Sequence, residues 1–194
     1  MTDKPVKLNV GCGRNIMDGW VNLDSIPLPG VDIVFDLESC ATRKIPLPDD
    51  AAEELFLSHV IEHIHNILPM MEELHRVARP DAKMIIRVPY GSSDDAYEDP
   101  THIRPCFIGT FGYFSQPFYW RADYGYRGDW QPKRITLAVE KRFVQTNNVT
   151  QIMAMVRHQR NVVKEMAVEL RCIKPIRSPA KELQESPEIT IQII

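Results

Sequence analysis

Short apolar stretches alternate with polar turns over the first ninety residues, at lengths typical of buried strands. The strands that this pattern predicts cover residues 7–10, 20–24, 32–36, 55–59 and 83–88. Residues 68–78 instead place apolar side chains at helical spacing, and Arg79-Pro80-Asp81 is expected to end that helix. Strands separated by crossovers predict an α/β fold with a mostly parallel sheet flanked by helices.

The pattern changes after Tyr90. Residues 91–133 are rich in Gly, Pro, Asp and aromatic side chains, and most of the aromatic residues lie between Phe107 and Trp130. We expect this segment either to form a lid or acceptor pocket over the sheet edge or to complete the core. Further strands are predicted over residues 135–139, 166–173 and 188–194, and a helix over 149–156. The expected organisation is a single domain, 1–194, divided into a core (1–90), the aromatic-rich region (91–133) and C-terminal strands and helix (134–194).

Bulk properties narrow the classes of function. The chain has 194 residues and a net charge of −3, and this lack of a basic surplus argues against nucleic-acid binding. No apolar run is long enough for a membrane helix, and four scattered cysteines fit a reducing compartment, so we expect a cytoplasmic protein. The alternating segment 188–194 must pair with a sheet in this chain or in a partner subunit, which leaves a homodimer open.

The first predicted strand runs into Gly11-Cys12-Gly13, a turn that lets the backbone approach a ligand. Only residues 14–19 separate this turn from the next strand. Six helical residues rise only about 9 Å, whereas the return along a five-residue strand needs roughly 15 Å, so the first crossover is expected to be extended. Without a helix N-terminus a pyrophosphate site is disfavoured, and an adenosyl ligand with an amino-acid tail fits better.

Two acids close the next two strands. Asp24 is placed to accept hydrogen bonds from ribose hydroxyls, and Asp36 is placed to meet an adenine amino group. Each acid alone could equally be a helix cap or a turn residue. Together with the glycine turn, they favour ligand binding at the carboxyl edge of the sheet.

Several segments in combination carry a family likeness. They are LNVGCGRNIMDGWVNLD (8–24), DIVFDLE (32–38), LSHVIEHI (57–64), MMEELHRVARPDAKMIIRVPY (70–90) and DPTHIRP (99–105). Over roughly its first 115 residues the chain resembles a class I S-adenosylmethionine (SAM)-dependent methyltransferase. It is most similar to a bacterial group, methyltransferase type 11-like, with a shortened first crossover.

The resemblance implies a Rossmann-like methyltransferase fold, SAM as the cofactor and a set of cofactor-binding residues. Residues implied near the methionine part of SAM are Asn9, Gly11, Cys12 and Gly13. Asp24 would hold the ribose, Asp36 and Leu37 would border the adenine, and Ser58 and His59 would lie near the methyl group. The superfamily's usual third glycine is absent, which leaves the methionine carboxylate to Arg14.

Histidines supply the candidate catalytic groups. His59 and His102 could each accept a proton from a hydroxyl or amine acceptor, or could be structural. The string from His59 to His63 also reads HxxEH, which on a helix could bind zinc in a hydrolase. The absence of a convincing third ligand disfavours that alternative, and we predict no metal site.

The leading prediction is an enzyme that transfers a methyl group from SAM to a small-molecule or sugar-like acceptor by direct displacement. A local group of arginines, Arg104, Arg121 and Arg127, leaves room for an acidic substrate. The alternatives are a non-catalytic SAM-binding or scaffold protein of the same fold and, less favoured, the zinc hydrolase. The sequence does not identify the acceptor.

Overall fold

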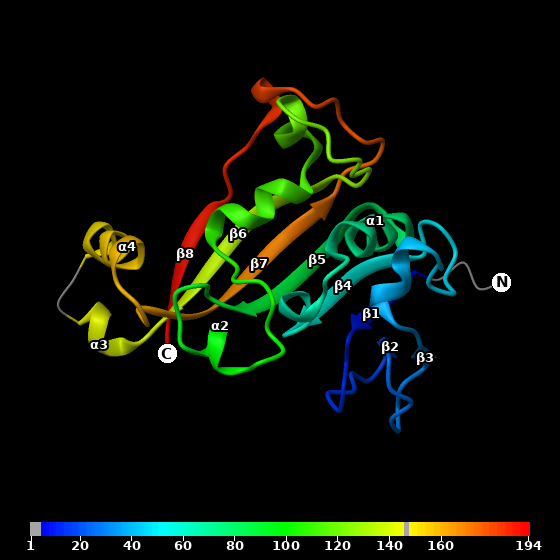
Figure 1. The fold of residues 1–194 in the computed structure, drawn as a ribbon, viewed down its shortest axis with the longest axis horizontal. Helices are drawn as coiled ribbons and strands as arrows, with labels where there is room; N and C mark the ends of the chain where they lie inside the picture. Colours follow the sequence, from blue (N-terminus) through cyan, green and yellow to red (C-terminus); the bar gives the residue numbers. More distant parts are fainter. Residues whose placement is uncertain (1–4, 146–147) are drawn as a thin grey trace.

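A computed structural model of the protein describes residues 5–145 and 148–194 (Figure 1). Its centre is an eight-stranded sheet with the order β3-β2-β1-β4-β5-β7-β6-β8. The strands are β1 (Val6–Val10), β2 (Val21–Asp24), β3 (Ile33–Val34), β4 (Ala52–Ser58), β5 (Ala78–Pro89), β6 (Trp130–Val139), β7 (Val163–Cys172) and β8 (Glu188–Ile193). Only β7 runs antiparallel to its neighbours, so the predicted mostly parallel sheet is confirmed.

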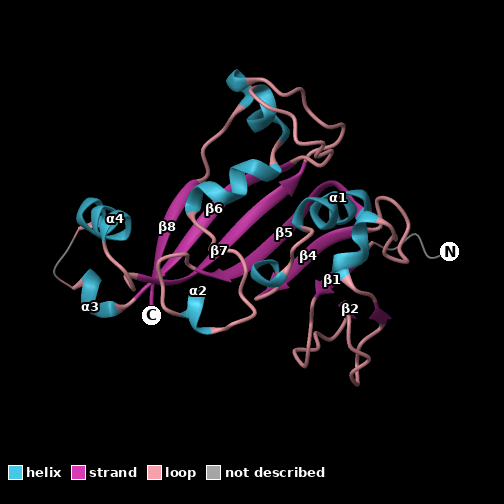
Figure 2. Ribbon diagram, viewed as in Figure 1, coloured by secondary structure: helices cyan, strands magenta, loops and turns pink. Residues whose placement is uncertain are grey.

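Helices and 3-10 turns occupy the connections (Figure 2). The α-helices are α1 (Ile67–Val77), α2 (Asp95–Glu98), α3 (Lys141–Val144) and α4 (Val149–His158). The 3-10 helices are η1 (Leu37–Ala41), η2 (Ile61–His63), η3 (Ile108–Phe114), η4 (Gln116–Trp120) and η5 (Lys181–Leu183). Buried side chains of α1, including Met71 and Leu74, join Leu55 and Leu57 of β4 in one apolar core. No helix in the described ranges is long and apolar enough to cross a bilayer.

The first crossover is extended, as predicted: residues 11–20 form turns and bends without a helix. Two buried asparagine side chains replace the hydrogen bonds that a helix would make. Asn9 Nδ2 donates to Asn15 O and to Asn22 Oδ1, each at 2.9 Å. Asn22 Oδ1 also accepts from Met17 N at 2.9 Å. These bonds hold the short loop against the ends of β1 and β2.

Two predicted boundaries are wrong. The strand expected over residues 32–36 is only two residues long, because Asp36 caps η1 by accepting from Glu38 N at 3.0 Å. The helix predicted over residues 68–78 ends before Arg79 as expected, but the strand expected to begin at Lys83 begins at Ala78, directly after α1. Pro80 is tolerated there because pairing of β5 with β4 is irregular between Ala78 and Lys83.

The sheet face opposite α1 is polar. Along β4, Leu55 and Leu57 are buried against the core, while Glu54, Phe56 and Ser58 point to the other face and are only partly buried. Cross-strand ion pairs cover this face: Lys7 Nζ lies 2.9 Å from Glu54, Lys83 Nζ lies 3.9 Å from Glu169, and Arg87 Nη2 lies 2.6 Å from Glu165. Because these pairs are partly exposed, each contributes little stability, but together they keep the uncovered face compatible with water.

The aromatic-rich segment is divided between core and surface. Its fully buried members include Phe111, Tyr126 and Trp130, and Trp130 Nε1 donates to Met71 O at 3.0 Å. Tyr113 and Tyr124 are exposed. Much of this segment therefore completes the core beside β6. Its role as an acceptor lid stays a prediction.

The C-terminal segment forms β8, which pairs in parallel with β6 from Arg134↔Glu188 to Val139↔Ile193. This confirms that the alternating pattern specifies a paired strand, and its partner lies within this chain. Deletion of residues 188–194 should lower solubility or shift the oligomeric state, because it would uncover the edge of β6. Sedimentation velocity measures this, with Ile194→Ser as a control that keeps the strand. An unchanged sedimentation profile of the deletion variant would contradict the expectation.

Candidate functional site

The glycine turn and Asp24 are joined directly. Gly13 N donates to Asp24 Oδ2 at 2.7 Å, and Ile26 N donates to Asp24 Oδ1 at 3.0 Å. Gly11 and Gly13 both have positive φ, 64° and 52°. At Gly11 a Cβ atom would also lie 2.6 Å from Val60 Cγ2, so this position needs glycine for conformation and for space.

A pocket of about 180 Å³ opens beside this turn. Its lining residues are Gly11, Leu23, Asp24, Ser25, Phe35, Leu37, His59, Val60, His63 and Ile64. Apolar side chains form most of the wall, and the Asp24 carboxylate supplies a charged acceptor. The predicted placement of Gly11 and Asp24 at one edge of the sheet is therefore observed.

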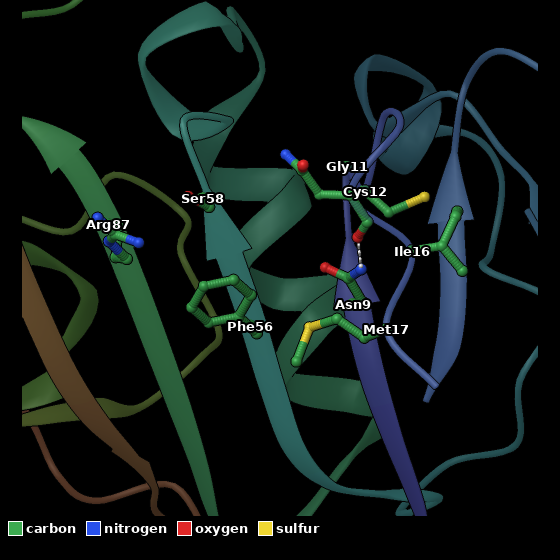
Figure 3. Close-up of a pocket in the computed structure, with 9 residues that line it drawn as sticks. Asn9, Gly11, Cys12, Ile16, Met17, Phe56, Ser58 and Arg87 are labelled. Carbon is green, nitrogen blue, oxygen red and sulfur yellow. Dashed lines mark hydrogen bonds between the residues drawn. The ribbon is translucent and has the colours of Figure 1, made fainter. Parts of the chain in front are cut away.

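A second pocket, of about 400 Å³, lies on the polar face of the sheet (Figure 3). Its lining residues are Asn9, Gly11, Cys12, Asn15, Ile16, Met17, Phe56, Ser58 and Arg87. Figure 3 shows the side chains of Asn9 and Met17 close together, with Phe56 of β4 beside them and Arg87 on the neighbouring strand β5. The extended first crossover forms one wall of this pocket. Gly11 borders both pockets.

Most of the predicted cofactor-binding residues come together at these two pockets. Gly13 lines neither, but its amide holds Asp24. Asp36 lines neither pocket and acts as the η1 cap, so its contact with adenine stays a prediction. Arg14 is exposed and lines neither pocket, whereas Arg87 lies in the wall of the larger one.

The larger pocket also contains three residues that the sequence pattern did not indicate, namely Phe56, Met17 and Arg87. Phe56 and Arg87 lie within strands, and Met17 lies in an irregular loop. The available signal was the alternation in β4 and β5, which turns Phe56, Ser58 and Arg87 to the same face of the sheet. That signal does not say which face is open.

His59 follows β4 with left-handed backbone, φ 55°. Its Nε2 lies 3.0 Å from Glu165 Oε1, and its Nδ1 lies 3.4 Å from Glu62 Oε1. The adjacent Glu62 carboxylate, and then Glu165, raise the pKa of His59 against the opposing effect of partial burial. His59 is therefore an imidazole in the pocket wall whose protonated form the two carboxylates stabilise.

His102 lies elsewhere: its side chain is 8% exposed, and it lines neither pocket. Its ring meets the ring of His63 edge-on, with 4.7 Å between ring centroids. The α-helix required by the zinc-hydrolase alternative is absent from residues 59–63. His59 has left-handed backbone, and residues 61–63 form only the short η2. The HxxEH interpretation as a hydrolase motif is therefore wrong.

Cys12 presents a neutral thiol to the larger pocket. Burial, with a contribution from the Asp24 carboxylate, raises the pKa of Cys12. A thiolate nucleophile is therefore disfavoured there, and the side chain contributes packing.

Comparison with known proteins agrees with this architecture. A family described as "Methyltransferase domain" matches residues 8–86. A SAM-dependent methyltransferase from Archaeoglobus fulgidus is similar in structure, with a TM-score of 0.58, 16% identity and coverage of 87% of this chain and 86% of that chain. One from Aquifex aeolicus has a TM-score of 0.52, 17% identity and coverage of 87% and 82%. No curated protein matches the sequence.

Proposed function

We propose that the chain is a class I SAM-dependent methyltransferase, with SAM as its cofactor, and that it methylates a small-molecule or sugar-like acceptor by direct displacement. The observation that carries the proposal is the joined Gly11–Gly13 turn and Asp24 carboxylate beside two pockets of about 180 and 400 Å³. Pockets of a few hundred Å³ suit small molecules.

The smaller pocket would take the adenosyl group. The Asp24 carboxylate faces the place of the ribose and can accept from its hydroxyls, because each oxygen now accepts only one backbone hydrogen bond. Phe35 and Leu37 offer an apolar surface to the adenine ring.

The methionine end would run along Gly11 and Cys12 toward the larger pocket, which these two residues border. Arg87 is the cation in that pocket, and we assign it, in place of Arg14, to the methionine carboxylate. Arg87 now pairs with Glu165 at 2.6 Å, so it would be shared between the two carboxylates.

The sulfonium methyl group is already activated, so the chain's main task is to align the acceptor with it. His59 lines the smaller pocket, here called the donor pocket, and the preceding residue, Ser58, lines the larger one. His102 lines neither pocket. We therefore assign to His59, rather than to His102, the role of accepting the acceptor's proton, in its neutral form.

Asp24→Ala should weaken SAM binding by about 2 kcal/mol, roughly thirtyfold in Kd, because charged hydrogen bonds to the ribose are lost. Calorimetric titration with SAM measures this. Asp36→Ala separately tests the predicted adenine contact, since its carboxylate caps η1 outside both pockets. Wild-type affinity in Asp24→Ala would overturn the ribose assignment, and a loss in Asp36→Ala would support the predicted adenine contact.

The transfer itself is tested by following labelled methyl from SAM into a panel of hydroxylated and amine-bearing small molecules. A labelled product that forms only with intact Asp24 would support the proposal. SAM binding without transfer to any member of a broad panel, or transfer only to macromolecules, would contradict the proposed acceptor class.

A further inference from the structure

Three side chains that the methyl-transfer proposal does not use converge behind the donor pocket. Glu62 and His63 belong to η2, and His102 lies in the segment between α2 and η3. Each offers one potential ligand atom, and these atoms all lie within 4.8 Å of one another. Residues forty positions apart in the chain thus form one compact cluster.

Glu62 is the unusual member. Its side chain is only 2% exposed, and neither carboxylate oxygen has a hydrogen-bond partner among the described residues. His59 Nδ1 lies 3.4 Å from Glu62 Oε1, an ion-pair distance without hydrogen-bond geometry. His102 Nδ1 is also buried without a partner in the described part of the chain. A buried carboxylate that accepts no hydrogen bond is costly, so Glu62 can still accept a further cation beside the His59 imidazole.

Hydrogen bonds around His63 fix which of its nitrogens is available. Thr101 Oγ1 lies 2.6 Å from Asp99 Oδ1 and 2.9 Å from His63 Nδ1. The hydroxyl has one proton, which it donates to the carboxylate, so His63 Nδ1–H must donate to the hydroxyl. The lone pair of His63 is then on Nε2. Such a relay from histidine to a carboxylate is typical of metal-binding histidines.

The two segments that carry the cluster are tied together. Ile103 N donates to Glu62 O at 2.9 Å, and Arg104 Nη1 donates to Ile64 O at 2.5 Å. These bonds hold His102 next to η2 and limit the movement that ligation would need. These backbone and side-chain hydrogen bonds therefore bring the three side chains together. The cross-strand ion pairs on the open sheet face have no part in this.

We propose that Glu62, His63 and His102 bind one divalent transition-metal ion, such as Zn²⁺ or Mn²⁺. Two imidazoles and a carboxylate suit these ions, whereas Mg²⁺ and Ca²⁺ prefer oxygen ligands alone. The ligand atoms must draw together by about 1 Å to meet bond lengths of about 2.0–2.2 Å. Because His63 also lines the smaller pocket, the ion would lie in the wall of the donor site.

The test uses the full chain after dialysis against a chelator, with ZnCl₂ and MnCl₂ as separate probes in calorimetric titration. We expect one equivalent of at least one ion to bind, and a saturating excess of about 100 Kd to raise Tm by roughly 5–10 °C. Glu62→Gln and His102→Ala should each weaken binding at least a hundredfold. Thr101→Val should weaken it about 10–100-fold by freeing His63 from its relay.

His158→Ala is the matched control, because it removes an exposed imidazole from α4. Loss of binding in this variant equal to that in His102→Ala would show surface binding and overturn the proposal. So would the absence of stoichiometric binding of either ion to the wild type. SAM titration of the same variants keeps the two proposals separate, since loss of metal with retained SAM binding concerns this site alone.

Discussion

Replacing Gly11 with alanine is expected to raise the Kd for SAM at least tenfold and to lower the free energy of unfolding by about 2–5 kcal/mol. The positive φ of 64° costs an alanine about 1–2 kcal/mol. The new Cβ would also lie 2.6 Å from Val60 Cγ2, and relief of such a contact typically costs about 1–3 kcal/mol. Gly11 borders both pockets and Val60 lines the smaller one, so a displacement of Gly11 or Val60 would deform the proposed SAM site.

Gly13→Ala is the matched control for this prediction. Gly13 has a similar φ of 52°, but no atom lies within 4 Å of the position that its Cβ would take. Its amide, which donates to Asp24, is kept. We expect only the backbone cost of about 1–2 kcal/mol. Urea unfolding and SAM titration measure both variants, and equal losses would show that the contact with Val60 has no part in the effect.

Trp130→Ala should lower the free energy of unfolding by about 3–5 kcal/mol, the scale of emptying a large aromatic site in a core. Trp130 is fully buried, packs edge-on against His75 with ring centroids 5.8 Å apart, and donates from Nε1 to Met71 O of α1. Its removal would leave a cavity between β6 and α1 and remove the hydrogen bond that the indole donates to Met71 O. Chemical denaturation monitored by circular dichroism measures the loss.

Trp120→Ala is the comparison, since Trp120 is 38% exposed and its ring stacks with Arg121 and Lys181. We expect a loss of about 1 kcal/mol, the scale of exposed cation–π contacts. If Trp130→Ala and Trp120→Ala lowered the free energy of unfolding equally, the division of the aromatic segment into a core part and a surface part would be incorrect.

The sequence by itself determined the sheet and the position of the Gly11–Gly13 turn at its edge. Apolar runs of strand length separated by crossovers are sufficient to predict a mostly parallel sheet, because local periodicity identifies the strands and a crossover returns the chain in the same direction. The short span of residues 14–19 determined an extended first crossover, since chain length limits the distance that a helix can cover. The joint position of Gly11 and Asp24 followed from the rule that parallel strands end at one edge.

Only the tertiary structure decided which groups surround the site. Arg87 and Phe56 reach the larger pocket, whose lining contains no residue of a described helix, and alternation alone does not reveal which face stays open. Asp36 is a residue whose position in the sequence favoured ligand binding. In the structure its side chain caps η1 instead. The meeting of His102 with Glu62 depends on a contact across forty residues, and such long-range proximity has no local signature in a single sequence.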